Sequence, residues 1–218
     1  EEIYKLLLKN GCEHFFVATT KEGISLRKKY KKGNIYILNG IEFNDVNIFK
    51  KFNLIPILSN YSDYKKILSQ SIKFGIQINT GINRLGLNYN DFKKISYKDE
   101  KLKILISHLA SADEVKNPYN KLQLKNFKKI VKQSKNNKII FSLANTFGSV
   151  LSTQYLFDMI RPGIALYGGH FNNPILKRKI KSVVKLKAKV LQIKQLEKNE
   201  FIGYNQTFRT KKKTWVAV

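Results

Sequence analysis

The chain has 218 residues, of which 43% are hydrophobic, so it can bury a sizeable core and is not globally disordered. No stretch approaches the roughly 18 apolar residues of a membrane-spanning helix, so we expect no membrane partner. The single cysteine, Cys12, excludes an intramolecular disulfide and a cysteine metal cluster, and we expect no metal site. One cysteine also fits a reducing compartment, which predicts a cytoplasmic protein.

The net charge is +26, from 41 basic and 15 acidic residues, and such a charge raises the question of nucleic-acid binding. Only five of the basic residues are arginines, and the lysines are spread along a chain that is also rich in Asn and Ile. That composition is typical of codon bias in an AT-rich genome. A nucleic-acid reader would more often concentrate its charge in a stripe and use Arg for bidentate contacts. We therefore expect no nucleic-acid partner.

Seven short apolar runs follow one another, each rich in Ile, Val, Leu or Phe, as buried parallel strands are. They occupy residues 14–18, 34–38, 54–58, 75–79, 102–106, 139–143 and 159–160. Their centres are 19 to 35 residues apart, which leaves room for one crossover helix each time. Seven such units predict an α/β fold, either a barrel or a doubly wound sheet.

Two of the predicted helices have recognisable ends or faces. Residues 1–10 form a helix that ends at Gly11, and because no strand precedes it, a strand is expected to be missing. A later helix has Ser62 or Asp63 as its N-cap and an apolar face made of Tyr64, Ile67, Leu68 and Ile72.

The pattern changes after Gly169. Residues 183–196 alternate between apolar and basic side chains, which predicts a half-exposed antiparallel strand that opens an all-β domain. The chain stops within the apolar run 214–218, so we expect an internal fragment of a longer protein. The predicted divisions are an α/β domain at 1–170, a linker at 171–182 and a truncated β domain at 183–218.

Polar segments come directly after the last four predicted strands, at residues 79–86, 107–114, 145–146 and 161–169. In α/β folds, ligands bind at the carboxyl ends of the strands, so Arg84, His108, Thr146 and Arg161 can meet around one anionic ligand. A hydroxyl with backbone N–H groups at this place is typical of a phosphate site. Each residue alone has an ordinary explanation: a surface ion pair, a core histidine, a helix N-cap or, for Gly163, a turn. Their common position favours a site.

The same segments carry motifs of a known family. Thr80–Gly86 is similar to D-T-G-M-x-R-x-G, Ser107–Glu114 to T-H-F-A-x-A-D-E, and Ala144–Thr146 to A-N-S. Arg161–Gly168 matches R-P-G-I-A-L-Y-G without a change and is the most specific of the four. The chain thus resembles alanine racemase, a fold-type III pyridoxal-phosphate enzyme, over nearly its whole length.

The resemblance implies a (β/α)8 TIM-type barrel missing its first strand, followed by the start of a C-terminal β domain. The seven runs would be strands two to eight. In the family, the first strand carries the lysine that forms the Schiff base with the cofactor, and a tyrosine across the dimer interface is the second base. Neither lies in this sequence, so no catalytic residue is assigned in the chain. We expect a fragment that is inactive alone, from a homodimer that interconverts L- and D-alanine for peptidoglycan synthesis.

The resemblance also implies roles for three charged residues. Arg161 would hydrogen-bond the pyridine nitrogen and, because a guanidinium keeps its proton, would leave that nitrogen unprotonated and the ring a weaker electron sink. His108 would pack on the ring and support Arg161. Arg84 would reach the phenolic oxygen of pyridoxal phosphate and the carboxylate of the substrate.

The phosphate would lie on Thr146 and the backbone N–H groups of Gly163 and Ile164, with Asn145 beside it. Thr146 stands where the commoner family residue is Ser and keeps the hydroxyl. Two departures affect Arg84: Asn79 replaces the usual Asp, and Gln77 replaces a lysine that many members carry as a negatively charged carbamate. Gln77 can hydrogen-bond Arg84 but brings no charge.

Three alternatives stay open. A serine racemase or a racemase of broad specificity would share this fold. A non-catalytic pyridoxal-phosphate-binding barrel would be single-domain, and the alternating segment after Ser182 argues against it. A basic nucleic-acid-binding module remains an alternative only because of the high net charge. The affinity of such a module for nucleic acid would fall steeply as the salt concentration rises.

Overall fold

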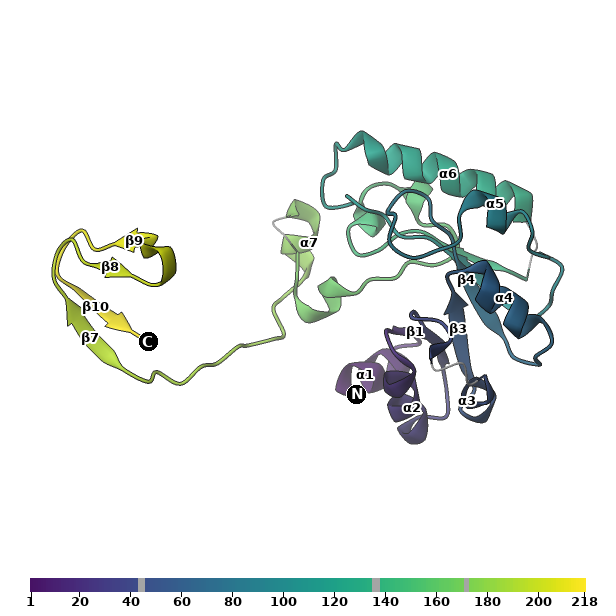
Figure 1. Ribbon diagram of the computed structural model, residues 1–218, viewed down its shortest axis with the longest axis horizontal. Helices are drawn as coiled ribbons and strands as arrows, with labels where there is room; N and C mark the ends of the chain where they lie inside the picture. The colour runs from purple at the N-terminus through teal and green to yellow at the C-terminus, as the bar shows by residue number, and fades with distance from the viewer. Residues whose placement is uncertain (43–45, 135–137, 171–172) are drawn as a thin grey trace. The chain divides into compact units, whose positions relative to one another are not determined.

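The computed structural model describes residues 1–42, 46–134, 138–170 and 173–218 (Figure 1). Within them, six strands form one parallel sheet in sequential order, with β1 and β6 at its edges. The strands are β1 (His14–Val17), β2 (Asn34–Ile37), β3 (Leu54–Leu58), β4 (Phe74–Gln77), β5 (Leu102–Ile106) and β6 (Ile140–Ser142). Their places confirm the first six predicted strands, and the parallel pairing of β2 with β3 agrees with the predicted α/β fold.

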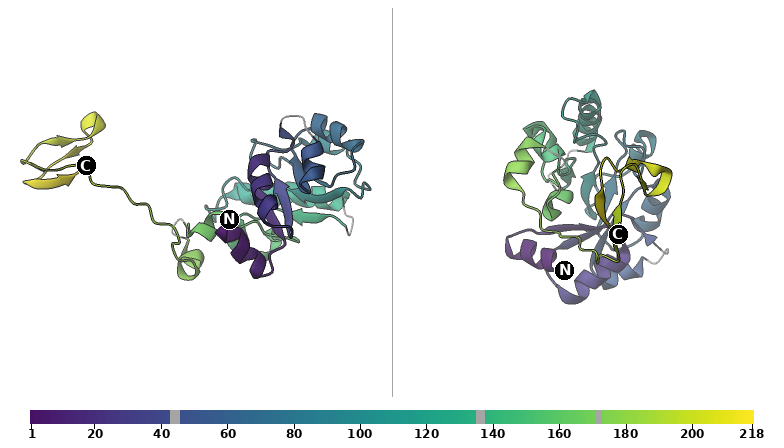
Figure 2. Two further views of the ribbon diagram at one scale, coloured as in Figure 1. Left: turned by 90° about the horizontal axis from the view of Figure 1, so that it is seen from below. Right: turned by 90° about the vertical axis from the view of Figure 1, so that its left-hand side faces the viewer.

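Helices alternate with the strands, and Figure 2 shows them around the outside of the sheet. They are α1 (Glu2–Lys9), α2 (Thr20–Lys29), α3 (Asn47–Lys51), α4 (Tyr61–Leu68), α5 (Tyr89–Phe92) and α6 (Pro118–Ser134). After β6 come three short 3₁₀ turns, η2 (Gly148–Val150), η3 (Thr153–Tyr155) and η4 (Ile164–Tyr167), and then α7 (Pro174–Lys179). This alternation of strand and helix is the architecture of an α/β barrel.

Both faces of the sheet are buried, in two hydrophobic clusters. The larger cluster packs Ile35, Ile37 and Leu58 of the strands against helical residues such as Ile67 and Phe127. The smaller cluster contains the neighbouring strand residues Tyr36, Ile55, Ile57, Ile104 and Ile106. Consecutive strand residues point to opposite faces, so the smaller cluster lies on the face away from the helices. Most residues of the strands are therefore apolar, with exceptions such as His14, Gln77 and Lys103.

Local hydrogen bonds explain where two helices begin. Thr19 and Glu22 form a capping box at the start of α2. Asn60 caps α4 by accepting the Asp63 N–H at 2.8 Å, so the predicted N-cap, Ser62 or Asp63, was wrong. Asn60 is the last extended residue before the helix, and its side chain can therefore turn back onto the first turn.

The predicted apolar face of α4 is confirmed for Tyr64 and Ile67, which are buried. Leu68 is the last residue of the helix and is 43% exposed, so its place on that face was wrong. Ile72 is buried but lies beyond the end of the helix.

The seventh predicted strand, at residues 159–160, does not form. Next to β6 and its continuation, this region forms an isolated parallel bridge between Asn145 and Arg161 and a backbone hydrogen bond from Asp158 N to Phe141 O at 3.1 Å, but no continuous ladder. Pro162 follows immediately, and because proline has no N–H to donate, it cannot extend the ladder. The segment still lies beside β6, since Ser142 Oγ donates to Met159 O at 2.6 Å.

Two compact units are present, residues 1–181 and residues 182–218. In place of the predicted linker at 171–182, residues 173–181 belong to the first unit, where Leu176 of α7 is buried in the larger cluster. Residues 171–172 lie outside the described residues.

The second unit is a small β structure. It contains β7 (Ile193–Leu196), β8 (Phe201–Ile202), η5 (Tyr204–Gln206), β9 (Phe208–Arg209) and β10 (Thr214–Ala217). The strands pair antiparallel, β7 with β10 and β8 with β9. The predicted strand over 183–196 exists only from Ile193, because β10 pairs with four residues of it and residues 183–190 have no strand partner within the described chain. Alternation shows that a segment can form a strand, but a ladder also needs a neighbour.

Candidate functional site

The loops after β4, β5 and β6 meet the segment around Arg161 at one edge of the sheet. In a parallel sheet the carboxyl ends of all strands lie at the same edge, where α/β proteins bind ligands. Ser107 follows β5 directly, and its N–H donates to Ser142 O of β6 at 3.1 Å. Arg161 reaches the same place, because its backbone N–H donates to Ala144 O at 2.9 Å.

The Arg161 guanidinium is fixed by two of these strand ends. One of its nitrogens donates to the Ser142 hydroxyl and another donates to the Ser107 carbonyl. Ser142 gives its own proton to Met159 O, so its oxygen is oriented as an acceptor for the guanidinium. The guanidinium carbon also lies 5.8 Å from the centre of the Phe16 ring on β1. Burial lowers the pKa of Arg161 to about 10, which still leaves it a cation at neutral pH.

His108 is influenced by the charges of both Arg161 and Arg84. Its Nε2 is 3.5 Å from Nδ2 of Asn145, and its ring is half-buried. Burial first, and then the positive charges of Arg161 and Arg84, lower the pKa of His108 to about 4. The His108 ring is therefore neutral at physiological pH. A neutral imidazole can pack against a ligand and form a hydrogen bond with it without adding a charge.

Thr146 and Asn145 organise the backbone after β6. The buried Thr146 Oγ1 accepts the Gly163 N–H at 3.0 Å and the Ala165 N–H at 3.5 Å. Asn145 Oδ1 accepts the Gly148 N–H at 2.9 Å. A Cβ added to Gly163 would meet no atom within 4 Å, so space is open where a side chain would stand at this position. The two amides that donate to Thr146 are thus those of Gly163 and Ala165.

Of the predicted charged site residues, Arg84 has the side chain that is least fixed by hydrogen bonds. It is exposed, and within the described part of the chain no hydrogen bond or ion pair of its guanidinium is found. Its positive charge contributes to the lowered pKa of His108. Gln77 does not bind Arg84 but donates from Nε2 to Leu85 O at 3.0 Å. Asn79 accepts the N–H groups of Gly81 and Asn83, which closes the turn that carries Arg84.

Sequence reasoning missed two residues of this site, Ser107 and Ser142. Both hold Arg161, and both stand at the carboxyl end of a strand, which is the signal that could have identified them. Sequence alone does not show which of the polar residues at strand ends face one another.

A cavity of about 470 Å³ opens beside Arg161. Its lining includes Phe16, Val17, Ile160, Leu166 and Tyr167. This volume lies within the roughly 300 to 1,000 Å³ of ordinary small-molecule sites. The lining also includes Glu1, Glu22 and His14, and of the predicted site residues it includes Arg161 but not Arg84, His108, Thr146 or Gly163.

Two kinds of feature are absent over residues 1–42, 46–134, 138–170 and 173–218. No three His, Cys, Asp or Glu side chains gather there as metal ligands would. No helix in the same ranges has both the length and the apolar character to cross a membrane.

Two family models match the chain in order. The model described as alanine racemase, N-terminal domain, matches residues 1–171, and the model described as alanine racemase, C-terminal domain, matches residues 183–218. Among curated relatives, the alanine racemase of Rickettsia bellii is 39% identical over 99% of this chain, and that of Rickettsia canadensis is 37% identical over 99%. The chain spans 55% and 62% of the length of these two relatives.

Solved structures give the same result. The alanine racemase of Bartonella henselae, with covalently bound pyridoxal phosphate, is 30% identical and superposes with a TM-score of 0.79 over 97% of this chain and 61% of that one. The biosynthetic alanine racemase of Pseudomonas aeruginosa, at 21% identity, shows the fold alone, with a TM-score of 0.80 over 96% of this chain and 61% of that one. Together with the sheet described above, these similarities identify a partial α/β barrel followed by the start of a β domain.

Proposed function

Because the chain belongs to the alanine racemase family, we propose that the protein, at the length of its relatives, interconverts L- and D-alanine with pyridoxal phosphate as its cofactor. The observation that carries the proposal is the fixed Arg161 cation at the carboxyl ends of β5 and β6. Ser107 and Ser142 hold it beside a cavity of about 470 Å³. Arg161 also lies in the segment that matches its family motif without a change.

The donors present in this chain fit that cofactor. Thr146 contributes a hydroxyl and Gly163 an amide, with open space where a side chain would stand, and together they suit a phosphate. Arg161 would hold the pyridine nitrogen, with the neutral ring of His108 packed nearby. Arg84, exposed and positively charged, would bind the carboxylate of the amino acid.

Pyridoxal phosphate, when bound, supplies an electron sink that makes the Cα–H of an amino acid acidic. Arg161 sets the strength of that sink in this chain. With a pKa of about 10 it keeps its proton near neutral pH, so it donates a hydrogen bond but does not protonate its partner. By holding a pyridine nitrogen without protonating it, Arg161 would weaken the electron sink that the cofactor supplies. Racemisation also needs an acceptor and a donor for the proton on opposite faces, and we assign neither role to a residue of this chain.

The domain division, the assembly and the biological role are parts of the same proposal. We place the barrel part at residues 1–170, a connecting segment at 171–182 and the start of the β domain at 183–218, which the separate family-model matches to residues 1–171 and 183–218 support. A homodimer, a cytoplasmic location and a role in supplying D-alanine for peptidoglycan follow from the family resemblance.

The test is racemisation by the protein expressed at the length of its relatives, with L-alanine and L-serine as separate substrates. Wild-type protein with pyridoxal phosphate should racemise alanine faster than serine. Arg161→Lys should lower the rate about 100-fold, the usual effect of losing one preorganised donor. Lys132→Ala, on the exposed side of α6, is the control and should leave the rate unchanged. A wild-type protein that binds pyridoxal phosphate but racemises neither amino acid would contradict the proposal.

A further inference from the structure

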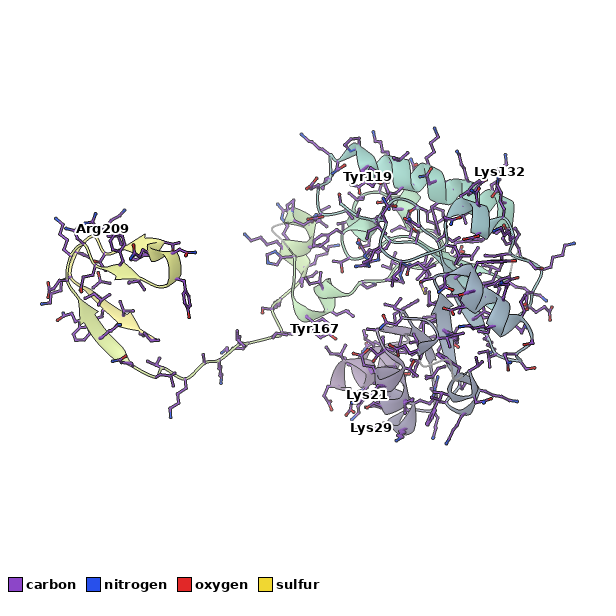
Figure 3. The ribbon with its side chains drawn as sticks, viewed as in Figure 1. Lys21, Lys29, Tyr119, Lys132, Tyr167 and Arg209 are labelled. Carbon is purple, nitrogen blue, oxygen red and sulfur yellow. The ribbon has the colours of Figure 1, made fainter. Side chains whose placement is uncertain are left out.

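One face of α6 is directed at the loop that carries Arg84, residues 79–86. Tyr119, Gln123 and Asn126 are spaced i, i+4 and i+7, so they share one side of the helix. Tyr119 Oη donates to Gly81 O at 2.8 Å, Gln123 Nε2 donates to Thr80 Oγ1 at 3.3 Å, and Asn126 Nδ2 donates to Thr80 O at 3.1 Å. Figure 3 labels Tyr119 near the start of the helix and Lys132 near its end. We call Tyr119, Gln123 and Asn126 the polar face of α6.

Gln123 joins this loop to the segment that carries His108. Its side chain is completely buried, and its Oε1 accepts the Ala110 N–H at 2.8 Å. Its Nε2 also donates to His108 O at 2.9 Å, which its second amide hydrogen allows. Thr80 in turn is hydrogen-bonded to Ser107, whose carbonyl holds Arg161, at 2.7 Å between the hydroxyl oxygens. α6 therefore connects the two segments that carry Arg84 and His108, and the Thr80–Ser107 bond extends this network to Arg161.

The loop is also closed on itself. Leu87 N donates to Gln77 O and Asn79 N donates to Leu87 O, both at 2.9 Å, and Gln77 binds Leu85 O. Gly81 has φ +146°, and a Cβ there would stand 2.7 Å from the Tyr119 hydroxyl. Glycine at position 81 thus lets Tyr119 reach the loop backbone. These hydrogen bonds fix the backbone on both sides of Arg84, although no hydrogen bond or ion pair of its guanidinium is found among the described residues.

We infer that the polar face of α6 positions Arg84 for the carboxylate of the substrate, an inference that rests on the proposed function. Among the described residues no carboxylate forms an ion pair with the guanidinium, and position 77 holds a neutral glutamine that binds the backbone instead. Its direction is therefore set by the loop, and the loop is set by α6. Tyr119, Gln123 and Asn126 are positioning residues, because they act through the loop and touch no substrate.

Tyr119→Phe tests the inference with little risk to folding, because it removes one hydroxyl and keeps the ring. The control is Tyr97→Phe, which removes a similar bond, from Tyr97 Oη to Phe92 O at 2.9 Å. In amide hydrogen exchange on the chain, Tyr119→Phe should speed exchange of residues 79–87 by about 2- to 10-fold, the equivalent of one net hydrogen bond. Tyr97→Phe should leave those amides unchanged. Asn126→Ala should repeat the effect of Tyr119→Phe, and exchange rates unaltered in both would overturn the inference.

The second measurement uses the enzyme at the length of its relatives. Tyr119→Phe should raise KM for alanine about 3- to 10-fold, leave the affinity for pyridoxal phosphate unchanged and change kcat by a smaller factor. A faster-exchanging loop with an unaltered KM would overturn the positioning role while the proposed function stands. A wild-type enzyme that does not racemise alanine would overturn both, and it would be recognised without any variant.

Discussion

His108 should make the stability of the first unit depend on pH in a defined window. Its pKa is about 4 in the folded protein, against 6.5 for an ordinary histidine, because partial burial and the positive charges of Arg161 and Arg84 disfavour the protonated ring. Between these values the unfolded chain binds a proton that the folded chain does not, so stability falls as the pH falls from about 6.5 towards 4. Above pH 6.5 both states are neutral and this contribution is fully present.

The magnitude follows from the shift. About 2.5 units at roughly 1.4 kcal/mol each gives about 3 kcal/mol when the loss is complete, below pH 4. Between pH 7 and pH 5 the same linkage gives about 2 kcal/mol, and partial exposure of the ring reduces this to about 1 to 2 kcal/mol.

Urea unfolding at pH 7 and pH 5, followed by far-ultraviolet circular dichroism, measures this loss. The helical signal reports on the first unit, because every α-helix of the described chain lies within residues 1–181. His108→Gln should lose about 1 to 2 kcal/mol less than wild type between the two pH values. Some dependence should remain from His14, whose pKa burial also lowers. If His108→Gln loses as much stability as wild type, the reasoning about its buried neutral ring is refuted.

Three further predictions concern packing, a buried arginine and the phosphate residues. Gly75→Ala should destabilise by about 1 to 3 kcal/mol in urea unfolding, because its Cβ would lie 2.5 Å from side-chain atoms of Ile57 and Ile104. Arg27→Lys should cost about 2 to 4 kcal/mol in the same assay, because the buried guanidinium donates to six backbone carbonyls that one ammonium cannot serve. Thr146→Val should weaken pyridoxal-phosphate binding about 10-fold in a fluorescence titration, while Thr146→Ser should bind like wild type; equal affinities for the two variants would contradict the phosphate assignment.

The first six strands could be predicted from sequence because their cores are apolar, and in all of them except β1 most residues are buried. The polar segments after them were equally visible, because each begins where an apolar run ends. His108 and Arg161 were selected in this way as candidate site residues, and their family motifs added the expected roles.

The tertiary structure decided everything that depends on a partner distant in the sequence. Residues 159–160 look like a strand but are limited by Pro162, and residues 183–190 alternate like a strand but pair with no strand in the described part of the chain. Ser142 is one more polar residue in the sequence, and only the fold brings it to Arg161, 19 positions away. Tyr119 reaches Gly81 over 38 positions. Local patterns record which side chains avoid water, whereas hydrogen bonds between loops depend on distances and directions that exist only once the sheet has formed.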